Sequence, residues 1–369
     1  MKILEIDRDT LLRPLQAVSG IVERRHTLPI LSNVLIETEG SQLRLLATDL
    51  EIQVATQASL DGAANQQSVT VSARKLQDIL RSLPEKTAVT LDLQDSKLAL
   101  KAGKSRFNLQ TLPAQDFPRL SPGPEDGVTS ISLPQKQLKS MLQLVQYSMA
   151  QQDIRYYLNG LLLVIEKNAL LMVATDGHRL AYAESALADG HARSELIVPR
   201  KAILELVKLL SDSEAPVEIQ LQQNQVRFRF GDIDLVSKVV DGKFPDYTRV
   251  IPTNYKKHFK TSRLALLQAL QRAAILSNEK FRGVRWVLGS KSLHIVCTNA
   301  EQEEAEEVME IDYAADAMDI GFNITYLLDV LNSLSVEEVD CALGDANSSM
   351  LITVPGDRHF KYVVMPMRI

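Results

Sequence analysis

Apolar residues recur at helical spacing in three stretches of this chain, one in each third. The first stretch covers residues 9–22, where Asp9 or Thr10 is placed to cap the predicted helix. Its counterparts cover residues 134–150 and 261–277. A short run of alternating apolar and polar residues precedes the first helix and predicts a strand. Each third is therefore expected to open with a strand and a helix.

Alternation continues beyond these helices and predicts antiparallel strands. Residues 34–37 and 43–48 alternate around Glu39 and Gly40, so we expect a hairpin that turns at this pair. A second helix and further strands follow, which gives two helices and about eight short strands in each third. In the first third the other strands include residues 2–6, 88–93, 98–102 and 105–111.

Short motifs recur at a nearly constant interval. The motif LRLLATD at residues 43–49 returns as LLMVATD at 170–176 and as LHIVCTN at 293–299, with starts 127 and 123 residues apart. A Phe-Pro pair recurs at Phe117 and Phe244, also 127 residues apart. The second predicted helix follows the same register, with copies at 76–83, 203–210 and 327–334. This period is far longer than that of solenoid repeats, so one domain is used three times.

Two helices on one face of an antiparallel sheet give an α+β domain. Segments rich in turn-forming residues near 122–127 and 252–254 separate the copies. The expected fold is thus three tandem domains over residues 1–125, 126–252 and 253–369.

Composition narrows the class of protein. The 369 residues are 45% hydrophobic, which supplies a core for each third. The first residues have no apolar run typical of a signal peptide, and no stretch has the length of a membrane span. Cys297 and Cys341 lie on strand-like runs and are expected to be buried thiols rather than a disulfide or metal site. We expect a soluble cytoplasmic protein with no metal and no cofactor.

Charge is distributed unevenly along the chain. The net charge is −5, yet basic residues outnumber acidic ones in residues 8–25, 134–150 and 260–282, in and around the first helix of each third. If symmetry places these helices on one surface, that surface is positive and suits a polyanion. Ordinary solvated helix faces are the alternative explanation.

Residues 175–179 are the best catalytic candidate, because Asp176, His178 and Arg179 lie close together. The same position in the other thirds holds Asp49 and Asn299 without the histidine and arginine. A shared turn in which the polar side chain bonds to the backbone explains this recurrence better than catalysis does. Phosphate-binding glycine loops and the usual hydrolase and metalloprotease motifs are missing from the sequence.

Longer motifs resemble a known family, and they are spread from the middle of the chain to its last residue. They are DIRYYLNG at 153–160, ATDGHRL at 174–180, VPRK at 198–201, VVDGKFPDY at 239–247, ILSNEKFRG at 275–283, EQEEAEE at 301–307 and YVVMPMRI at 362–369. Together they resemble the bacterial DNA polymerase III beta subunit, the replicative sliding clamp. The resemblance implies a head-to-tail homodimer that forms a closed ring, with helices lining a hole around duplex DNA.

The implied function is that of a non-catalytic processivity factor within a polymerase holoenzyme. Its implied partners are double-stranded DNA, a second copy of the chain, the replicative polymerase alpha subunit, the clamp-loader delta subunit, translesion polymerases, mismatch-repair proteins, DNA ligase and an initiation regulator. A DNA-processing enzyme that uses residues 175–179, and a structural scaffold without DNA binding, are the alternatives.

The resemblance also implies contacts with DNA, from the loop of residues 152–157 and from basic side chains. The expected DNA-contacting residues are Arg25, Arg74, Gln152, Tyr156, Tyr157, Arg200 and Lys201. A partly buried strand pair is the alternative for the two tyrosines.

Complementary charges around apolar centres predict the dimer contact. One side is basic around Phe107, and the other is acidic near Ile275 and Leu276, which suits a head-to-tail interface. The basic residues are Lys75, Lys101, Lys104 and Arg106, and the acidic residues are Glu301, Glu303, Glu304, Glu306 and Glu307.

A peptide-binding pocket is implied between the second and third domains. Its ligands would be linear segments with a Gln and spaced Leu or Phe anchors, and the methionines would give an adaptable wall. The implied pocket residues are Leu158, Thr175, Gly177, His178, Arg179, Leu180, Pro245, Arg249, Val250, Phe281, Asn323, Tyr326, Ser349, Val363, Val364, Met365, Pro366, Met367 and Arg368.

Overall fold

The computed structural model describes residues 2–23, 27–121, 123 and 127–368. Contacts within the chain divide it into two units. The first unit contains Met1–Leu138 and Leu204–Val239, and the second contains Lys139–Ile203 and Val240–Ile369. No helix among the described residues is long and apolar enough to cross a bilayer.

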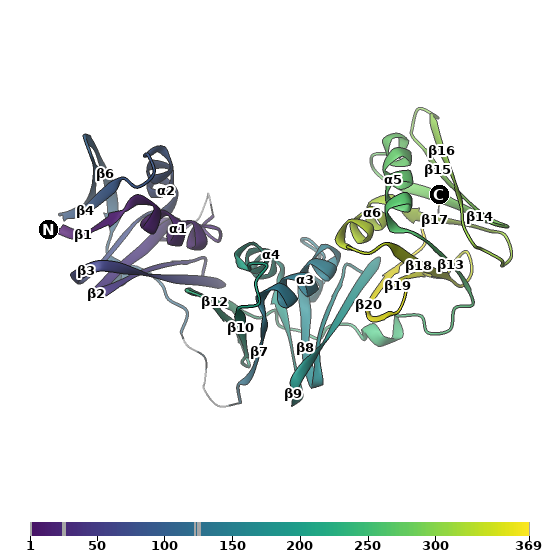
Figure 1. Cartoon of the computed structure of the whole chain (residues 1–369), viewed down its shortest axis with the longest axis horizontal. Helices are drawn as coiled ribbons and strands as arrows, with labels where there is room; N and C mark the ends of the chain where they lie inside the picture. The colour runs from purple at the N-terminus through teal and green to yellow at the C-terminus, as the bar shows by residue number, and fades with distance from the viewer. Residues whose placement is uncertain (1, 24–26, 122, 124–126, 369) are drawn as a thin grey trace. The chain divides into compact units, whose positions relative to one another are not determined.

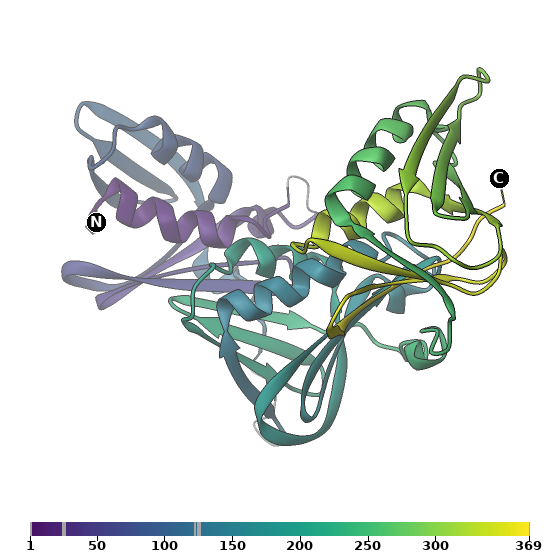
Figure 2. The same cartoon turned by 45° about the vertical axis from the view of Figure 1, so that its right-hand side comes forward.

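An antiparallel ten-stranded sheet forms the first unit (Figure 1). Its order is β1 (Lys2–Asp7), β4 (Ala88–Gln94), β5 (Lys97–Ala102), β6 (Ser105–Leu112), β3 (Ile52–Ser72), β12 (Ile233–Lys238), β11 (Gln225–Phe230), β10 (Pro216–Leu221) and β7 (Thr129–Pro134), with β2 (Asn33–Thr48) paired to β3. Helices α1 (Arg8–Ser19) and α2 (Ala73–Ser82) pack side by side over it, as Figures 1 and 2 show.

The second unit contains two antiparallel sheets. The six-stranded sheet has the order β13 (Lys257–Ser262), β18 (Glu338–Leu343), β19 (Met350–Val354), β20 (Asp357–Val364), β9 (Arg179–Pro199) and β8 (Gly160–Thr175). The four-stranded sheet has the order β16 (Glu304–Glu310), β15 (Ser292–Thr298), β14 (Gly283–Gly289) and β17 (Met318–Asn323). Helices α5 (Arg263–Ala273) and α6 (Ile324–Ser333) lie side by side and contact both sheets (Figure 2). The α+β class is confirmed.

The two remaining helices, α3 (Gln135–Val145) and α4 (Arg200–Leu209), correspond to α1 and α2 in the order of elements. Each predicted first helix is therefore present but shorter than expected, since 3₁₀ turns η3 (Gln146–Ser148) and η6 (Ala274–Leu276) follow α3 and α5. The predicted cap of α1 was wrong. Extended Asp7 ends β1 and accepts from the Asp9 backbone N–H at 2.8 Å, so the helix starts two residues earlier than Thr10.

The predicted hairpin at Glu39 and Gly40 was also wrong. Residues 33–48 form one strand, β2, which pairs along its whole length with β3 and has a register shift near Gly40. Gly40 has φ +56, which accommodates a bulge without reversing the chain. The reversal occurs at residues 49–51 instead. Strands β8 and β9 repeat this arrangement, so two predicted short strands become one long strand.

Aromatic residues fill the core of the second unit. Trp286, Phe259 and Phe322 are at most 1% exposed, and the Trp286 ring centroid lies 5.5 Å from that of Phe322. Cys297 on β15 and Cys341 on β18 are buried and free, which confirms the prediction of buried thiols.

Candidate functional site

Residues 175–179 form the turn between β8 and β9, and the acid holds that turn together. Asp176 Oδ1 accepts from the backbone N–H groups of His178 and Arg179 at 2.9 and 3.0 Å. Asp49 and Asn299 accept backbone N–H groups in the corresponding turns after β2 and β15. The shared turn is confirmed, and it accounts for the carboxylate without a catalytic role.

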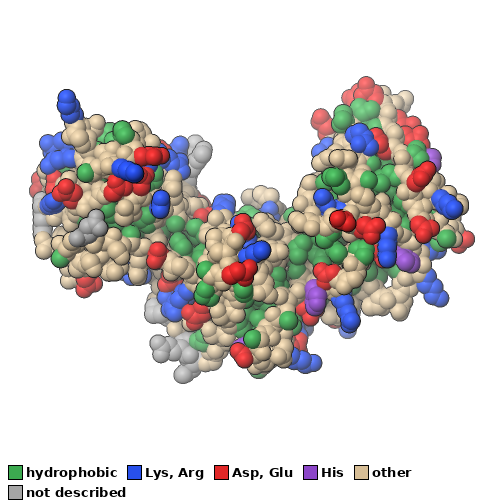
Figure 3. Space-filling view, viewed as in Figure 1, with side chains coloured by type: hydrophobic (Ala, Val, Ile, Leu, Met, Phe, Trp, Pro, Cys, Tyr) green, Lys and Arg blue, Asp and Glu red, His purple; other side chains and the backbone are tan. Residues whose placement is uncertain are grey.

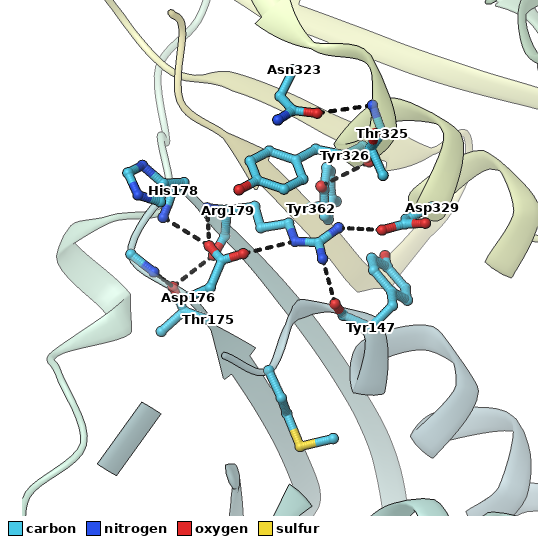
Figure 4. Close-up of polar contacts among 12 residues, drawn as sticks. Tyr147, Thr175, Asp176, His178, Arg179, Asn323, Thr325, Tyr326, Asp329 and Tyr362 are labelled. Atoms are coloured by element: carbon cyan, nitrogen blue, oxygen red, sulfur yellow. Dashed lines mark hydrogen bonds and ion pairs between the residues drawn. The ribbon is translucent and has the colours of Figure 1, made fainter. Parts of the chain in front are cut away.

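Arg179 is the centre of the polar network drawn in Figure 4. Its side chain is only 10% exposed. Nε donates to Asp176 Oδ2 at 3.1 Å, Nη1 to Asp329 Oδ2 at 2.6 Å, and Nη2 to the Tyr147 carbonyl at 2.6 Å. The guanidinium also lies over the Tyr326 ring, 4.3 Å from its centroid. Arg179 thus fastens the turn to α6 and η3, and most of its N–H groups are already used.

Two buried tyrosines, Tyr147 and Tyr362, pack next to Arg179 and add no charge to this network. The Tyr362 hydroxyl donates to the Tyr326 carbonyl at 2.9 Å, and the Tyr147 and Tyr362 ring centroids are 5.9 Å apart. Burial raises the pKa of both the Tyr147 and the Tyr362 hydroxyl, so both stay protonated at physiological pH.

The C-terminal segment adds an apolar border to the turn. Val363 and Val364 are buried in β20, so these two residues belong to the core. Beyond them, the Met365 N–H donates to the His178 carbonyl and the Met367 N–H to the Gly321 carbonyl, both at 2.9 Å. Residues 365–368 are therefore held against the turn and β17 by the backbone.

The predicted pocket residues divide into supports and exposed groups. Phe281 is 59% exposed, Met365 48% and Val250 45%. Asn323 caps α6 by accepting from the Thr325 N–H at 2.9 Å. The buried supports are Leu158, Thr175 and Leu180; Tyr326, Ser349, Pro366 and Met367 are half-buried; and Gly177, His178, Pro245, Arg249 and Arg368 are exposed.

Sequence reasoning missed Asp329 and Tyr147 in this network. It also missed Arg155, whose Nη2 donates to the Asp176 carbonyl at 3.1 Å. A signal existed for Asp329, since the second-helix motif carries an acid at the same place in each repeat, as Asp78, Glu205 and Asp329. The leucines of that motif belong to the core, but an acid kept on the same helix position is not explained by packing. Tyr147 contributes a backbone carbonyl, which no sequence motif can reveal.

The residues expected to contact DNA differ in how far they are exposed to solvent. Tyr156 is 57% exposed, whereas Tyr157 is half-buried against the apolar cluster of β8 and β9. Both lie in a 3₁₀ turn, η4 (Tyr156–Leu158), and not in a strand. Arg200 Nη1 donates to the Met149 carbonyl at 3.0 Å, and burial lowers the pKa of its guanidinium.

Of the remaining four, Gln152 is exposed with φ +57, and Lys201 is half-buried. Arg74 is exposed on α2 and has Asp78 at 3.8 Å. Arg25 lies outside the residues that the structure describes.

Each proposed half of the dimer contact lies on the surface of its own unit. In the first unit Lys75, Lys104 and Arg106 are exposed and Phe107 is half-buried. In the second, Ile275 is 78% exposed in η6, the turn that follows α5. Figure 3 shows basic side chains at the end of the first unit that carries β6 and acidic ones at the end of the second that carries β16.

The acidic side chains are partly paired within the second unit. Leu276 is half-buried, and Glu301, Glu303, Glu304 and Glu306 are exposed. Glu307 binds Arg272 at 2.6 Å, and this hydrogen bond lowers the pKa of the Glu307 carboxyl.

Comparison with known proteins covers the whole chain. Three family models match in succession: the N-terminal, central and C-terminal domains of the DNA polymerase III beta subunit, at residues 1–121, 132–246 and 248–368. The beta sliding clamp of Pseudomonas putida is 48% identical over 365 residues, and that of Escherichia coli K12 is 44% identical over 364 residues, each covering 99% of both chains.

Solved structures agree with the sequence matches. The crystal structure of the Pseudomonas aeruginosa DNA polymerase III subunit beta has a TM-score of 0.95 and 46% identity, with 100% of both chains covered. The same values hold for a P. aeruginosa sliding clamp bound to griselimycin. The chain belongs to the family of DNA polymerase III beta subunits, the bacterial sliding clamps.

Proposed function

We propose that this protein is the sliding clamp of a bacterial replicative polymerase, a non-catalytic subunit that encircles duplex DNA and tethers its partners to it. The observation that carries the proposal is the full-length match to beta sliding clamps, one domain model for each of the three repeats. The use of Asp176 as a turn residue supports the absence of catalysis.

A ring that encloses DNA needs only weak contacts with it. A ring that retains DNA by topology must not read bases or hold any phosphate tightly. Mobile lysines and arginines give a salt-screened, sequence-independent attraction that allows sliding. A polymerase bound to the ring then remains at high effective concentration near the primer end. The decisive test compares retention on nicked circular DNA before and after linearisation, since a ring is lost only from linear DNA.

Contacts with DNA are assigned to Arg25, Arg74, Gln152, Tyr156, Tyr157, Arg200 and Lys201. The exposed position of Gln152 and Tyr156 supports this assignment. Alanine at Arg25 and Gln152 together should weaken loading onto DNA without affecting the dimer. Alanine at Arg193, an exposed arginine outside this set, is the matched control. Unchanged loading of the double variant at moderate salt would remove these residues from the interface.

Closure of the ring is assigned to a head-to-tail contact between two copies. The basic residues Lys75, Lys104 and Arg106 around Phe107 would face the acidic residues 301–307 of a second copy, with Ile275 and Leu276 as apolar anchors. Alanine at Ile275 and Leu276 should shift sedimentation toward the monomer. Leu264→Ala removes a half-exposed apolar side chain from α5 and should leave the dimer intact. A double variant that stays dimeric at low concentration would contradict this interface.

Partner recognition is assigned to the surface formed by Phe281, Val250 and Met365 around the turn of residues 175–180. Its ligands would be linear segments of the polymerase alpha subunit, the clamp-loader delta subunit, translesion polymerases, mismatch-repair proteins, DNA ligase and an initiation regulator. Deletion of the last five residues removes nothing from β20, so the protein should stay folded and dimeric while losing its partners. Unfolding, or unchanged binding, would contradict the assignment.

A further inference from the structure

Asp153, Arg155 and Asn159 form a polar cluster in and beside the proposed DNA-contacting loop, and none of the three is assigned to either binding region. Residues 151–155 form a loop in which Gln152 adopts φ +57, a conformation that non-glycine residues rarely keep without support. Asn159 supplies that support, because its side chain accepts from the Asp153 N–H at 2.9 Å and donates to the Asp153 carbonyl at 2.8 Å. The shape of the loop is therefore set by hydrogen bonds from outside it.

Arg155 connects this loop to the turn after β8. Its Nε and Nη2 bind the two oxygens of Asp153 at 3.0 and 2.8 Å, a bidentate pair that lowers the pKa of the Asp153 carboxyl to about 2. The same Nη2 donates to the Asp176 carbonyl at 3.1 Å. The Arg155 guanidinium also lies so close to Gly177 that a Cβ there would be 2.9 Å from both Nη atoms. One side chain thus touches the loop and the turn at once.

A second connection runs through the backbone of residues 147–150. Arg179 donates to the Tyr147 carbonyl and Arg200 to the Met149 carbonyl, at 2.6 and 3.0 Å. The Ala150 N–H donates to the Leu158 carbonyl at 3.0 Å, which closes the base of the loop. The turn and the loop are therefore connected twice, once through Arg155 and once through the backbone of residues 147–150.

We propose that Arg155 is a positioning residue that couples the loop of residues 151–157 to the turn of residues 175–179, so that binding of DNA and binding of a peptide strengthen each other. The inference rests on the proposed function of these two regions. Either ligand restricts the motion of the shared network, and the second ligand then loses less conformational entropy on binding. Such coupling must be reciprocal, so each ligand changes the affinity of the other by the same factor.

The experiment measures peptide affinity of the full chain with and without DNA. The probes are a fluorescein-labelled synthetic peptide with Gln followed by Leu and Phe anchors, read by anisotropy, and a short primed duplex at low salt. One partly exposed, charge-assisted hydrogen bond suggests that saturating DNA lowers the peptide Kd about 3-fold in the native protein. Titration of DNA against saturating peptide should give the same factor.

Variants separate the coupling from a general structural effect. Arg155→Gln should reduce the ratio of the two Kd values to 1, whatever happens to either affinity alone, and Arg155→Lys should keep part of it. Arg193→Gln is the matched control, because Arg193 is 49% exposed against 45% for Arg155 and also binds carboxylates on its own sheet. It should keep the full ratio.

The outcomes distinguish this proposal from the proposed function. A native ratio of 1, or an undiminished ratio in Arg155→Gln, overturns the coupling while both binding functions stand. Failure of the native protein to bind either probe overturns the proposed function, and the coupling with it.

Discussion

Replacing Arg179 by methionine should destabilise the second unit strongly. Methionine keeps an unbranched side chain but removes every hydrogen bond, so the partners Asp176, Asp329 and the Tyr147 carbonyl are left behind. Asp176 is 16% and Asp329 34% exposed, so water reaches both carboxylates and each lost bond costs about 1.5 kcal/mol, the lower end for a charged pair. The Tyr147 carbonyl and the contact with the Tyr326 ring add about 1 kcal/mol each.

These terms add to about 5 kcal/mol, and methionine recovers part of the apolar contact, so the expected loss of unfolding free energy is about 3–4 kcal/mol. A loss of this size is comparable with the cost of breaking a buried ion pair. The chain has a single tryptophan, Trp286, which is fully buried on β14. Its fluorescence during urea unfolding reports on the sheet from which β17 leads into α6. With a urea dependence of about 3 kcal/mol per molar, the midpoint should fall by about 1 M.

Arg193→Met is the control for charge removal on the same sheet. Arg193 is 49% exposed and its pairs with Glu166 and Glu195 are solvated, so about 0–1 kcal/mol is expected. Asp329→Asn keeps an oxygen acceptor and should fall between the two variants. If the Arg179→Met midpoint moved no more than that of Arg193→Met, the network would not stabilise the unit as argued.

Three further outcomes are expected. Gly20→Ala should lower the calorimetric unfolding temperature, since a Cβ there would lie 1.6 Å from Glu205 Oε1. The buried Glu205 side chain must then move, at a cost of about 1–3 kcal/mol, and an unchanged temperature would show that it moves freely. Gly177→Ala puts a side chain at φ +89 and in contact with Arg155, so it should lower the free energy of unfolding by about 1–3 kcal/mol in the same measurement and weaken peptide binding. Gly231→Ala, at φ +52 with open space around it, tests the backbone contribution alone. Native protein at pH 8 should not react with a thiol reagent and denatured protein should expose two thiols, because burial raises the pKa of Cys297 to about 11 and that of Cys341 further; rapid native reaction would contradict their burial.

The repeated features of this protein were predictable because each is local. The turn at Asp49, Asp176 and Asn299 depends on one side chain and the next few backbone groups, so sequence alone indicates it. The hairpin failed for the opposite reason, since Gly40 is compatible with a turn or a bulge and only its long partner strand, β3, decides between them.

In the candidate site, too, local features were predictable from the sequence and contacts between distant residues were not. Its exposed residues were named from motif resemblance, whereas its stabilising partners were not. Arg179 and Asp329 are 150 positions apart, and their pairing depends on how β20 joins β9. An acid on a helix has many possible partners until that topology is known, so the sequence could mark Asp329 as unusual without indicating its role.

The repeats differ in how well their turns would suit the proposed apolar peptide. The Lys238 N–H donates to the Glu51 carbonyl in the first unit, as the Met365 N–H does to the His178 carbonyl in the second, both at 2.9 Å. The backbone contact is thus the same, but the side chains differ. Lys238 binds Glu51 at 3.1 Å and leaves a charged, solvated surface, whereas Met365 is 48% exposed and apolar. Since burial of exposed apolar area drives peptide association, the second turn can gain from a hydrophobic ligand and the first cannot.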